Sequence, residues 1–348
     1  MPGIPLSNFG STDTLATVYN ANPASRSTLI VLVEGDDDLG ILERWFVHER
    51  GRRVVSFSTP RAQGGKLDGC AGVIQVATTP QTSGVSIFGI VDRDYLVFAN
   101  RSLFLEEDDA EFAAKSPYTP YVRVLRQWEI ENYLLDVNTL MRVYADHHGD
   151  ARAAAFGVTT LEGIIASVAE AVLLLTATNI ALRDRMIEPF ESTWYLERTM
   201  TKAEMESMLN SVLYIDKLSP ADRSSFETER TAMLASLKAF GGGHPEGSRE
   251  YIRGLLRIID GKALFRRVLL KLKTSLKDSA AKRTMASHMA HIAGGVPAEV
   301  IEHIESFKSA ALPAIAAAGT SGSVMAESDD ALSKVGTAID ESSGGQSS

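Results

Sequence analysis

The sequence predicts an α/β fold in which a mostly parallel sheet is flanked by helices and followed by an all-α C-terminal domain. Two observations support this prediction. Short apolar runs alternate with helical patterns up to about residue 136, which is typical of a layered α/β structure. After that point the β-branched runs disappear, and Ala, Leu, Glu, Lys and Arg dominate.

The N-terminal part contains four runs that we interpret as strands. The third run, GVSIFGIVDRD, is apolar up to its acidic end, which favours a central position in a parallel sheet. Between the first two runs, Leu39, Leu42 and Trp45 recur at helical spacing, so a helix is expected over 37–49. The expected strands cover 29–33, 52–57, 84–94 and 121–130, a loop covers 59–69, and helices are expected at 11–20 and from Cys70 onward.

The C-terminal part is expected to be a series of helices. The segment GGGHPEG at 241–247 has the composition of a connector, and the last residues are rich in Gly, Ser and acids, which predicts disorder. The expected helices cover 137–147, 160–186, 202–213, 220–239, 249–259, 261–274, 279–292 and 297–310. We therefore divide the chain into an N-terminal segment (1–24), an α/β domain (25–136), a helical domain (137–312) and a tail (313–348).

The composition is that of a soluble globular protein, with 45% hydrophobic and 23% charged residues among 348. The first twenty residues lack the basic and apolar regions of a secretory signal. The single cysteine, Cys70, excludes an internal disulfide and a Cys-rich zinc site. Residues 163–182 are long enough for a bilayer span, but they include Glu170 and no second span follows, so a buried helix is favoured. We expect a cytoplasmic protein with no membrane partner.

Acidic residues stand where two of the expected strands end. Glu34 follows the first strand, and Asp92 and Asp94 close the third. Asp92 and Asp94 are two residues apart, so they share one face if the strand persists. Ligands bind at the carboxyl ends of the strands in open α/β sheets. If the two strands are neighbours, the three carboxylates converge and suit a hard cation, above all Mg²⁺.

Other interpretations of these acids remain open. Asp38 lies in the first turn of the expected helix, so it is either a ligand of a second ion or part of the helix cap. Asp36 and Asp37 fit solvated cap residues better than ligands. The alternative role for Asp92 and Asp94 is to cap the next helix, although the matching Glu34 favours a metal site.

The spacing of these motifs resembles a known family. A strand ending in VEG, followed 58 residues later (92 − 34) by a strand ending in DRD, resembles the Toprim fold of topoisomerases, primases and OLD-family nucleases. The likeness covers about residues 25–135. The segment RQWEIENYLL at 126–135 resembles one found in a family of unknown function related to the OLD nucleases. Some members of that family are the effector subunit beside an ATPase in bacterial anti-phage systems such as PARIS.

The resemblance implies a Toprim-like sheet and a nuclease that uses Mg²⁺ or Mn²⁺, with two ions expected. Glu34, Asp92 and Asp94 would be metal ligands, with Asp38 and Glu129 or Glu131 at or beside a second ion. Lys262, in DGKALFRRVL, matches a basic residue that OLD-type nucleases place near their metals, and it would stabilise the transition state or the leaving oxygen. Glu129 and Glu131, which share a face if they lie on a strand, have the alternative of pairing with Arg123 or Arg126. Lys262 is alternatively an ordinary residue at a helix start.

The expected substrate is DNA or RNA, including tRNA, and an ATPase would be a separate subunit. QGGKLDG is not a P-loop, because Lys66 is followed by Leu67 rather than Ser or Thr. A homodimer is left open. The rival interpretation is a non-catalytic Toprim scaffold that docks onto an ATPase, and the complete acidic set argues against it. A primase or topoisomerase is disfavoured because no zinc or nucleotide-loading module is visible.

The charge distribution is uneven. The net charge is −9, which does not favour nucleic-acid binding by the whole surface. Between Tyr251 and Arg283, however, ten basic residues are opposed only by Asp260 and Asp278. This segment is either a solvated helix face or a surface that binds a phosphate backbone. The candidate nucleic-acid-binding residues are Arg253, Arg257, Arg266, Arg267 and Lys271.

Overall fold

The computed structural model describes residues 29–47, 55–79, 85–190, 201–274, 276 and 278–311. The expected helix at 11–20, the N-terminal segment 1–24 and the tail 313–348 lie outside the described residues.

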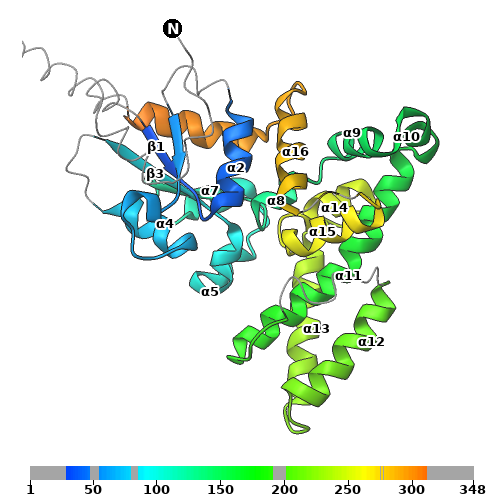
Figure 1. Cartoon of the computed structure of the whole chain (residues 1–348). Helices are drawn as coiled ribbons and strands as arrows, with labels where there is room; N and C mark the ends of the chain where they lie inside the picture. The colour runs from blue at the N-terminus through cyan, green and yellow to red at the C-terminus, as the bar shows by residue number, and fades with distance from the viewer. Residues whose placement is uncertain are drawn as a thin grey trace, which may run out of the picture.

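A parallel sheet of four strands forms the N-terminal part (Figure 1). The strands are β1 (Leu29–Leu32), β2 (Val55–Ser58), β3 (Ser86–Val91) and β4 (Val122–Val124), in the order β2-β1-β3-β4. All three neighbouring pairs are parallel, and Leu32 of β1 is in register with Gly89 of β3. The predicted α/β class is confirmed. Strands β1 and β3 are neighbours, and this is the condition under which their acidic ends can converge.

Helices cover both faces of this sheet. The chain passes from β1 to β2 through α2 (Asp36–Trp45) and back across β1 to β3 through α4 (Gly69–Thr78). Right-handed crossovers therefore place α2 and α4 on opposite faces. Helix α4 lies so close to β3 that a Cβ added at Gly89 would overlap the side chain of Val73.

The end of the described chain returns to the sheet. A last helix, residues 298–311, lies along the α/β part and is drawn in orange in Figure 1. Phe307 stacks on Phe88 of β3 with ring centroids 4.7 Å apart, and Arg123 of β4 donates a hydrogen bond to Ser306 at 3.1 Å. Helix α16 (Asp278–Ala290) packs against α2. The C-terminal helices thus complete the packing around the sheet, while the predicted domain boundaries stay a prediction.

Two strands are shorter than the sequence predicts. Strand β3 ends at Val91, because a 3₁₀ turn, η4 (Arg93–Tyr95), follows at once. The buried guanidinium of Arg93 holds this turn by donating to the carbonyl oxygens of Phe104, Glu106 and Arg126. The predicted strand 121–130 is wrong beyond β4. The 3₁₀ helix η3 (Arg61–Gln63) and the short helices α5 (Leu96–Ala99), α6 (Arg101–Phe104) and α7 (Asp109–Lys115) were not expected.

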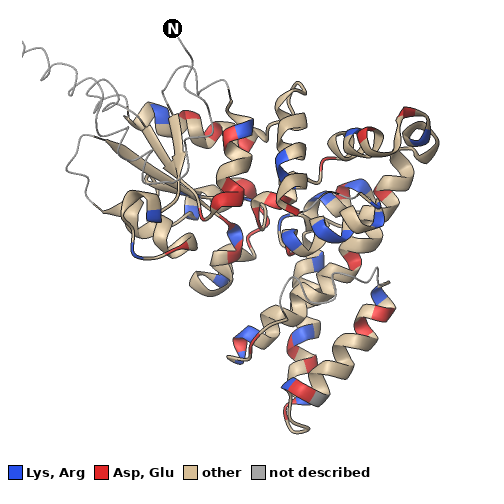
Figure 2. Cartoon of the chain, viewed as in Figure 1, with Lys and Arg blue, Asp and Glu red and all other residues tan. Residues whose placement is uncertain are grey.

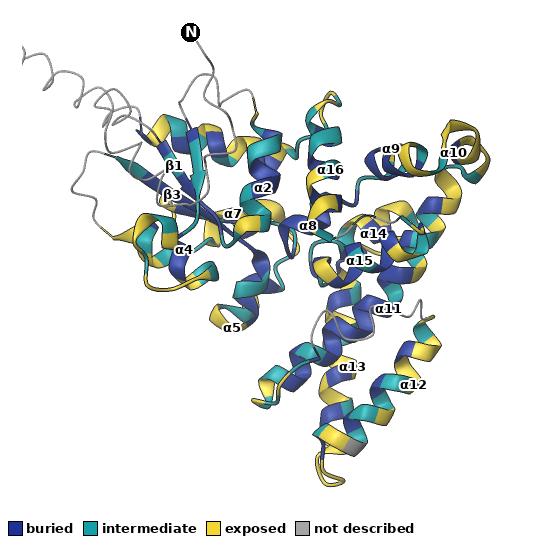
Figure 3. Ribbon diagram, viewed as in Figure 1, coloured by how far each residue is buried: buried dark blue, intermediate teal, exposed yellow. Residues whose placement is uncertain are grey.

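The C-terminal part is mostly helical, as predicted. Helix α11 (Val158–Asp184) runs through its centre and is mostly buried (Figure 3). Among the described residues it is the one helix long and apolar enough to cross a membrane, but 72% of its most apolar 18-residue stretch is buried, which favours a core helix. Around it lie α9 (Val137–His148), α10 (Asp150–Phe156), α12 (Lys202–Val212), the π-helical turn η5 (Leu213–Lys217), α13 (Arg223–Ala239), α14 (Arg249–Leu255) and α15 (Gly261–Lys271).

Candidate metal centre

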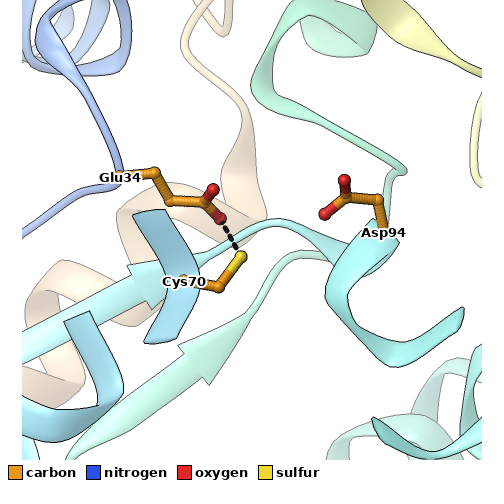
Figure 4. Close-up of side chains that lie close together, drawn as sticks. All are labelled: Glu34, Cys70 and Asp94. Carbon is orange, nitrogen blue, oxygen red and sulfur yellow. Dashed lines mark hydrogen bonds between the residues drawn. The ribbon is translucent and has the colours of Figure 1, made fainter. Parts of the chain in front are cut away.

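Glu34 lies at the point where the ends of β1 and β3 meet. Its Oε1 accepts a hydrogen bond from the backbone N–H of Asp92 at 2.9 Å and another from the thiol of Cys70 at 2.6 Å. Figure 4 shows the Glu34 carboxylate, the Cys70 thiol and the Asp94 carboxylate converging from three different elements. The convergence predicted for the two strand ends is therefore present.

Asp92 and Asp94 do not share a strand face, because the strand ends before them. Asp92 is the N-cap residue of η4 and is 6% exposed. Asp94 lies within the turn, and its backbone N–H donates to the carbonyl oxygen of Trp128 at 3.2 Å. A carboxylate oxygen of Asp94 lies within 4.8 Å of an oxygen of Glu34 and of Cys70 Sγ. The turn, rather than strand alternation, brings Asp94 into the site.

Asp38 has a cap role and also faces the acidic cluster. Its Oδ2 accepts a hydrogen bond from the backbone N–H of Gly35 at 3.1 Å, which satisfies a free donor at the start of α2. Burial, together with the charges of Glu131 and Glu34, raises the pKa of Asp38 to about 7. The cap role is confirmed, and the role of Asp38 as a ligand of a second ion stays a prediction.

Glu129 and Glu131 lie at the start of a helix rather than on a strand. Glu129 is the N-cap of α8 (Ile130–Tyr133), and Glu131 is in its first turn, so the expected shared strand face is wrong. Glu129 does not pair with Arg123 or Arg126. It accepts hydrogen bonds from the ammonium group of Lys262 at 2.7 Å and from its backbone N–H at 2.9 Å.

The glycine before Lys262 permits this contact. A Cβ added at Gly261 would overlap Oδ1 of Asn132 and approach Oε2 of Glu129 to 3.2 Å. Asn132 also caps the start of α8 by accepting from the backbone N–H of Glu129 at 3.1 Å. The first turns of α8 and α15 therefore lie in direct contact, with Lys262 facing the acidic cluster.

Lys282 is a site residue that the sequence did not single out. It is 4% exposed, and its ammonium nitrogen lies 2.8 Å from Asp37 and 2.8 Å from Glu131, which is 0% exposed. In the sequence, Lys282 is one of ten basic residues between Tyr251 and Arg283. Lys282 lies at helical spacing from Met285, Ala286 and Met289 on the buried face of α16, and this pattern could have indicated a buried lysine.

Acidic residues gather around the start of α2 and at α8 (Figure 2), and their buried carboxylates repel one another. Burial is the largest cause of each upward shift. It raises the pKa of Asp94 to about 6 and that of Glu129 to about 8, and it raises the pKa of Asp92 well above the usual range, with Glu34 and Asp38 adding to the effect. For Lys262, burial lowers the pKa, but the carboxylates of Glu129 and Glu131 outweigh it, so the ammonium form is favoured. Several buried carboxylates with raised pKa values thus lie close together, and such a cluster favours binding of a cation.

The donor set fits a divalent cation. One oxygen or sulfur each from Glu34, Cys70 and Asp94 lie within 4.8 Å of one another. Among the described residues, no hydrogen-bond donor reaches Oε2 of the buried Glu131. Carboxylate oxygens are the ligands that Mg²⁺ and Mn²⁺ prefer.

The basic segment is only partly exposed. Arg267 is 3% exposed, so it does not lie on an open surface as a backbone-binding residue would. Arg257, in the turn after α14, donates to Asp109 at the start of α7 at 2.6 Å and to the carbonyl oxygen of Glu107 at 2.7 Å. Arg253 is exposed, and Arg266 and Lys271 are half-buried.

No protein-family model matches this chain, and no curated protein matches its sequence. Its function is therefore argued from the geometry of the strand ends and from the sequence motifs.

Proposed function

We propose that the chain is a Toprim-type nuclease that depends on Mg²⁺ or Mn²⁺ and cleaves phosphodiester bonds of DNA or RNA. The observation that carries the proposal is the position of Glu34, hydrogen-bonded to the Asp92 backbone and within reach of Asp94. The parallel order β2-β1-β3-β4, with the VEG and DRD motifs at the ends of neighbouring strands, supports a Toprim-like domain.

The residues divide into two groups around the proposed ions. Glu34, Asp92 and Asp94 would hold one ion, and Asp38, Glu129 and Glu131 lie at or beside the second. Bound Mg²⁺ neutralises the phosphate and lowers the pKa of a coordinated water, which supplies the nucleophile. The chain's own contribution is to keep these carboxylates close together despite their repulsion.

Lys262 is placed to contact the substrate. Its side chain is 45% exposed, while its ammonium group is held 2.7 Å from Glu129. Because its pKa is raised, it carries a positive charge throughout the physiological range. That charge can stabilise the negative charge that develops on the phosphate or on the leaving oxygen.

The role of the nuclease as the toxic effector of an anti-phage system, beside a separate ATPase, is also part of the proposal. It rests on the resemblance of RQWEIENYLL to the OLD-related family and on the failure of QGGKLDG to match a P-loop. Cytoplasmic localisation follows from the same proposal.

A non-catalytic scaffold that docks onto an ATPase is the rival function. The two ion pairs favour it, because Lys262 with Glu129 and Lys282 with Glu131 offset part of the acidic charge without a metal. The remaining carboxylates of Glu34, Asp92 and Asp94 have no such lysine partner at ion-pair distance among the described residues, which supports the nuclease.

Cleavage assays separate the two functions. The purified full chain is incubated with labelled DNA and tRNA in Mg²⁺ or Mn²⁺, beside Asp92→Asn as the matched variant. The nuclease proposal predicts cleavage that EDTA abolishes and that Asp92→Asn lacks. Equal cleavage by Asp92→Asn would contradict the assignment of the site. Metal binding without cleavage of any substrate, by the chain alone or with an ATPase added, would favour the scaffold.

A further inference from the structure

Cys70 adds a sulfur atom to an otherwise all-oxygen site. It is the second residue of α4, and its thiol lies 2.6 Å from Glu34 Oε1. Gly69, with a φ of +61°, precedes it, and a Cβ at this glycine would lie 4.0 Å from Glu34 Oε2. The start of α4 is thereby held against the end of β1, and Cys70 is held within the acidic site.

The three donor atoms come from separate parts of the fold. Glu34 follows β1, Cys70 begins α4, and Asp94 lies in the turn after β3 (Figure 4). Their ligand atoms all lie within 4.8 Å of one another. In a tetrahedral zinc site, with about 2.3 Å to sulfur and about 2.1 Å to oxygen, ligand atoms are about 3.6 Å apart. Movements of about 1 Å would bring these atoms to that spacing.

A second observation concerns the acidic cluster beside these three donors, where Glu131 Oε1 pairs with Lys282. Glu131 is 0% exposed, and no donor among the described residues reaches its Oε2. Its charge, with that of Glu34, acts on Asp38. The lysines therefore neutralise only part of the negative charge of the acidic cluster, and a bound divalent ion would neutralise more of it.

The donor types determine which ion is preferred. Mg²⁺ requires oxygen ligands in an octahedral arrangement and does not favour sulfur. A thiolate selects softer ions such as Zn²⁺ and Cd²⁺, and one sulfur with two carboxylates leaves a fourth tetrahedral position for water.

We propose that Glu34, Cys70 and Asp94 form a binding site for one thiophilic divalent cation, Zn²⁺ or its analogue Cd²⁺. On binding, the S–H bond of Cys70 breaks, its proton leaves to solvent and a metal–sulfur bond forms. Because the carboxylates of Glu34 and Asp94 are then bound to this ion, they no longer bind Mg²⁺, and cleavage is inhibited. This inhibition rests on the proposed function, whereas the binding itself does not.

Titration of the metal-free full chain with Cd²⁺ tests the site, because a cadmium–thiolate bond has an ultraviolet charge-transfer band. Cys70 is the only cysteine in the sequence, so any such band reports on it. The wild type should show a band that saturates at one Cd²⁺ per chain, and Cys70→Ser should show none. Failure of the wild type to develop a band overturns the proposal.

The carboxylate ligands need variants of their own. Glu34→Gln and Asp94→Asn should keep the thiol but weaken Cd²⁺ binding by at least about tenfold, since loss of even an outer partner of a metal ligand costs about 10- to 100-fold. Asp36→Asn is the matched control, because Asp36 is an exposed carboxylate in the same segment. It should bind Cd²⁺ as the wild type does. Unchanged affinity in both Glu34→Gln and Asp94→Asn would indicate binding by the thiol alone and would overturn the three-residue site.

The inhibitory role has a separate readout. In the cleavage assay, Zn²⁺ should inhibit the wild type at concentrations at least about tenfold below those needed for Cys70→Ser. Equal sensitivity overturns the inhibitory role. A Cd²⁺ band in a chain that cleaves no substrate would leave the thiophilic site standing while the proposed nuclease function fails.

Discussion

Lys282 and Glu131 form a buried ion pair, 2.8 Å long, that connects α16 to the start of α8. The glutamate is 0% exposed, and the lysine also contacts Asp37 of α2 at 2.8 Å. A helix near the end of the described chain thus supplies positive charge to carboxylates that lie close to the strand ends. Both the stability of the fold and the arrangement of the acidic cluster are expected to depend on this contact.

Lys282→Met should be strongly destabilising. Removing one partner of a buried ion pair leaves an uncompensated charge and costs about 3–5 kcal/mol. Denaturant unfolding of the full chain measures this loss, with Lys273→Met, at an exposed position, as the control. The double variant Lys282→Met/Glu131→Leu should recover much of the stability. Equal stability of the Lys282→Met and Lys273→Met variants would show that the buried pair contributes little.

Stability without divalent ions should fall as pH rises. The folded-state pKa values of Asp94, Asp38 and Glu129 are raised to about 6, 7 and 8, so the folded chain binds more protons than the unfolded chain above about pH 4. The stability that these groups contribute is therefore lost progressively up to about pH 8.

Thermal unfolding in EDTA across this pH range measures the effect. Mg²⁺ should raise the melting temperature more at the alkaline end, where the carboxylates are ionised. Asp38→Asn should flatten the pH dependence. A melting temperature that rises with pH in EDTA would be the opposite of the expected sign.

Gly261→Ala should disturb the contact between α15 and α8. The added Cβ would overlap Oδ1 of Asn132, and overpacking costs about 1–3 kcal/mol. Gly163→Ala is the matched control, because this glycine lies in the second turn of α11 with open space around its Cβ position. The control should stabilise the chain by about 0.5–1 kcal/mol. Similar effects of the two substitutions on the free energy of unfolding would contradict the close approach of α15 to α8 at Gly261.

The exposed part of the basic segment should contribute to nucleic-acid binding. Neutralising Arg253, Arg266 and Lys271 together should weaken binding to every sequence tested. It should reduce the log–log salt slope by about 0.9 for each lost phosphate contact with duplex DNA. Arg267→Met serves as the control, because its buried side chain is expected to affect stability rather than the slope. An unchanged slope in the triple variant would assign these residues to a solvated helix face.

The sequence predicts the end of β1 well, because the apolar run stops at Glu34. The end of β3 was predicted too late, since the turn that begins after Val91 depends on Arg93 and its distant carbonyl partners, but the neighbouring strands still bring the acidic ends together. The length of the fourth strand was not predictable from the apolar pattern alone. Glu129 and Asn132 form a capping box there, so a helix begins where the strand was expected to continue.

Contacts between distant segments account for the remaining features of the site. Helix 298–311 returns to stack Phe307 on Phe88, and α16 brings Lys282 to Glu131, so both contacts join residues that lie more than 150 positions apart in the sequence (307 − 88 = 219 and 282 − 131 = 151). Cys70 reaches Glu34 only because α4 crosses the sheet after β2. A local sequence pattern places each of these residues on an element but does not determine which elements meet.

Binding of Mn²⁺ to the metal-free full chain, followed by electron paramagnetic resonance, tests the central claim most directly, because it requires neither the substrate nor an ATPase partner. The account predicts that the wild type binds Mn²⁺ and that Asp92→Asn, folded as judged by circular dichroism, binds it at least about tenfold more weakly. Equal binding by the wild type and Asp92→Asn would contradict a metal centre at the ends of β1 and β3.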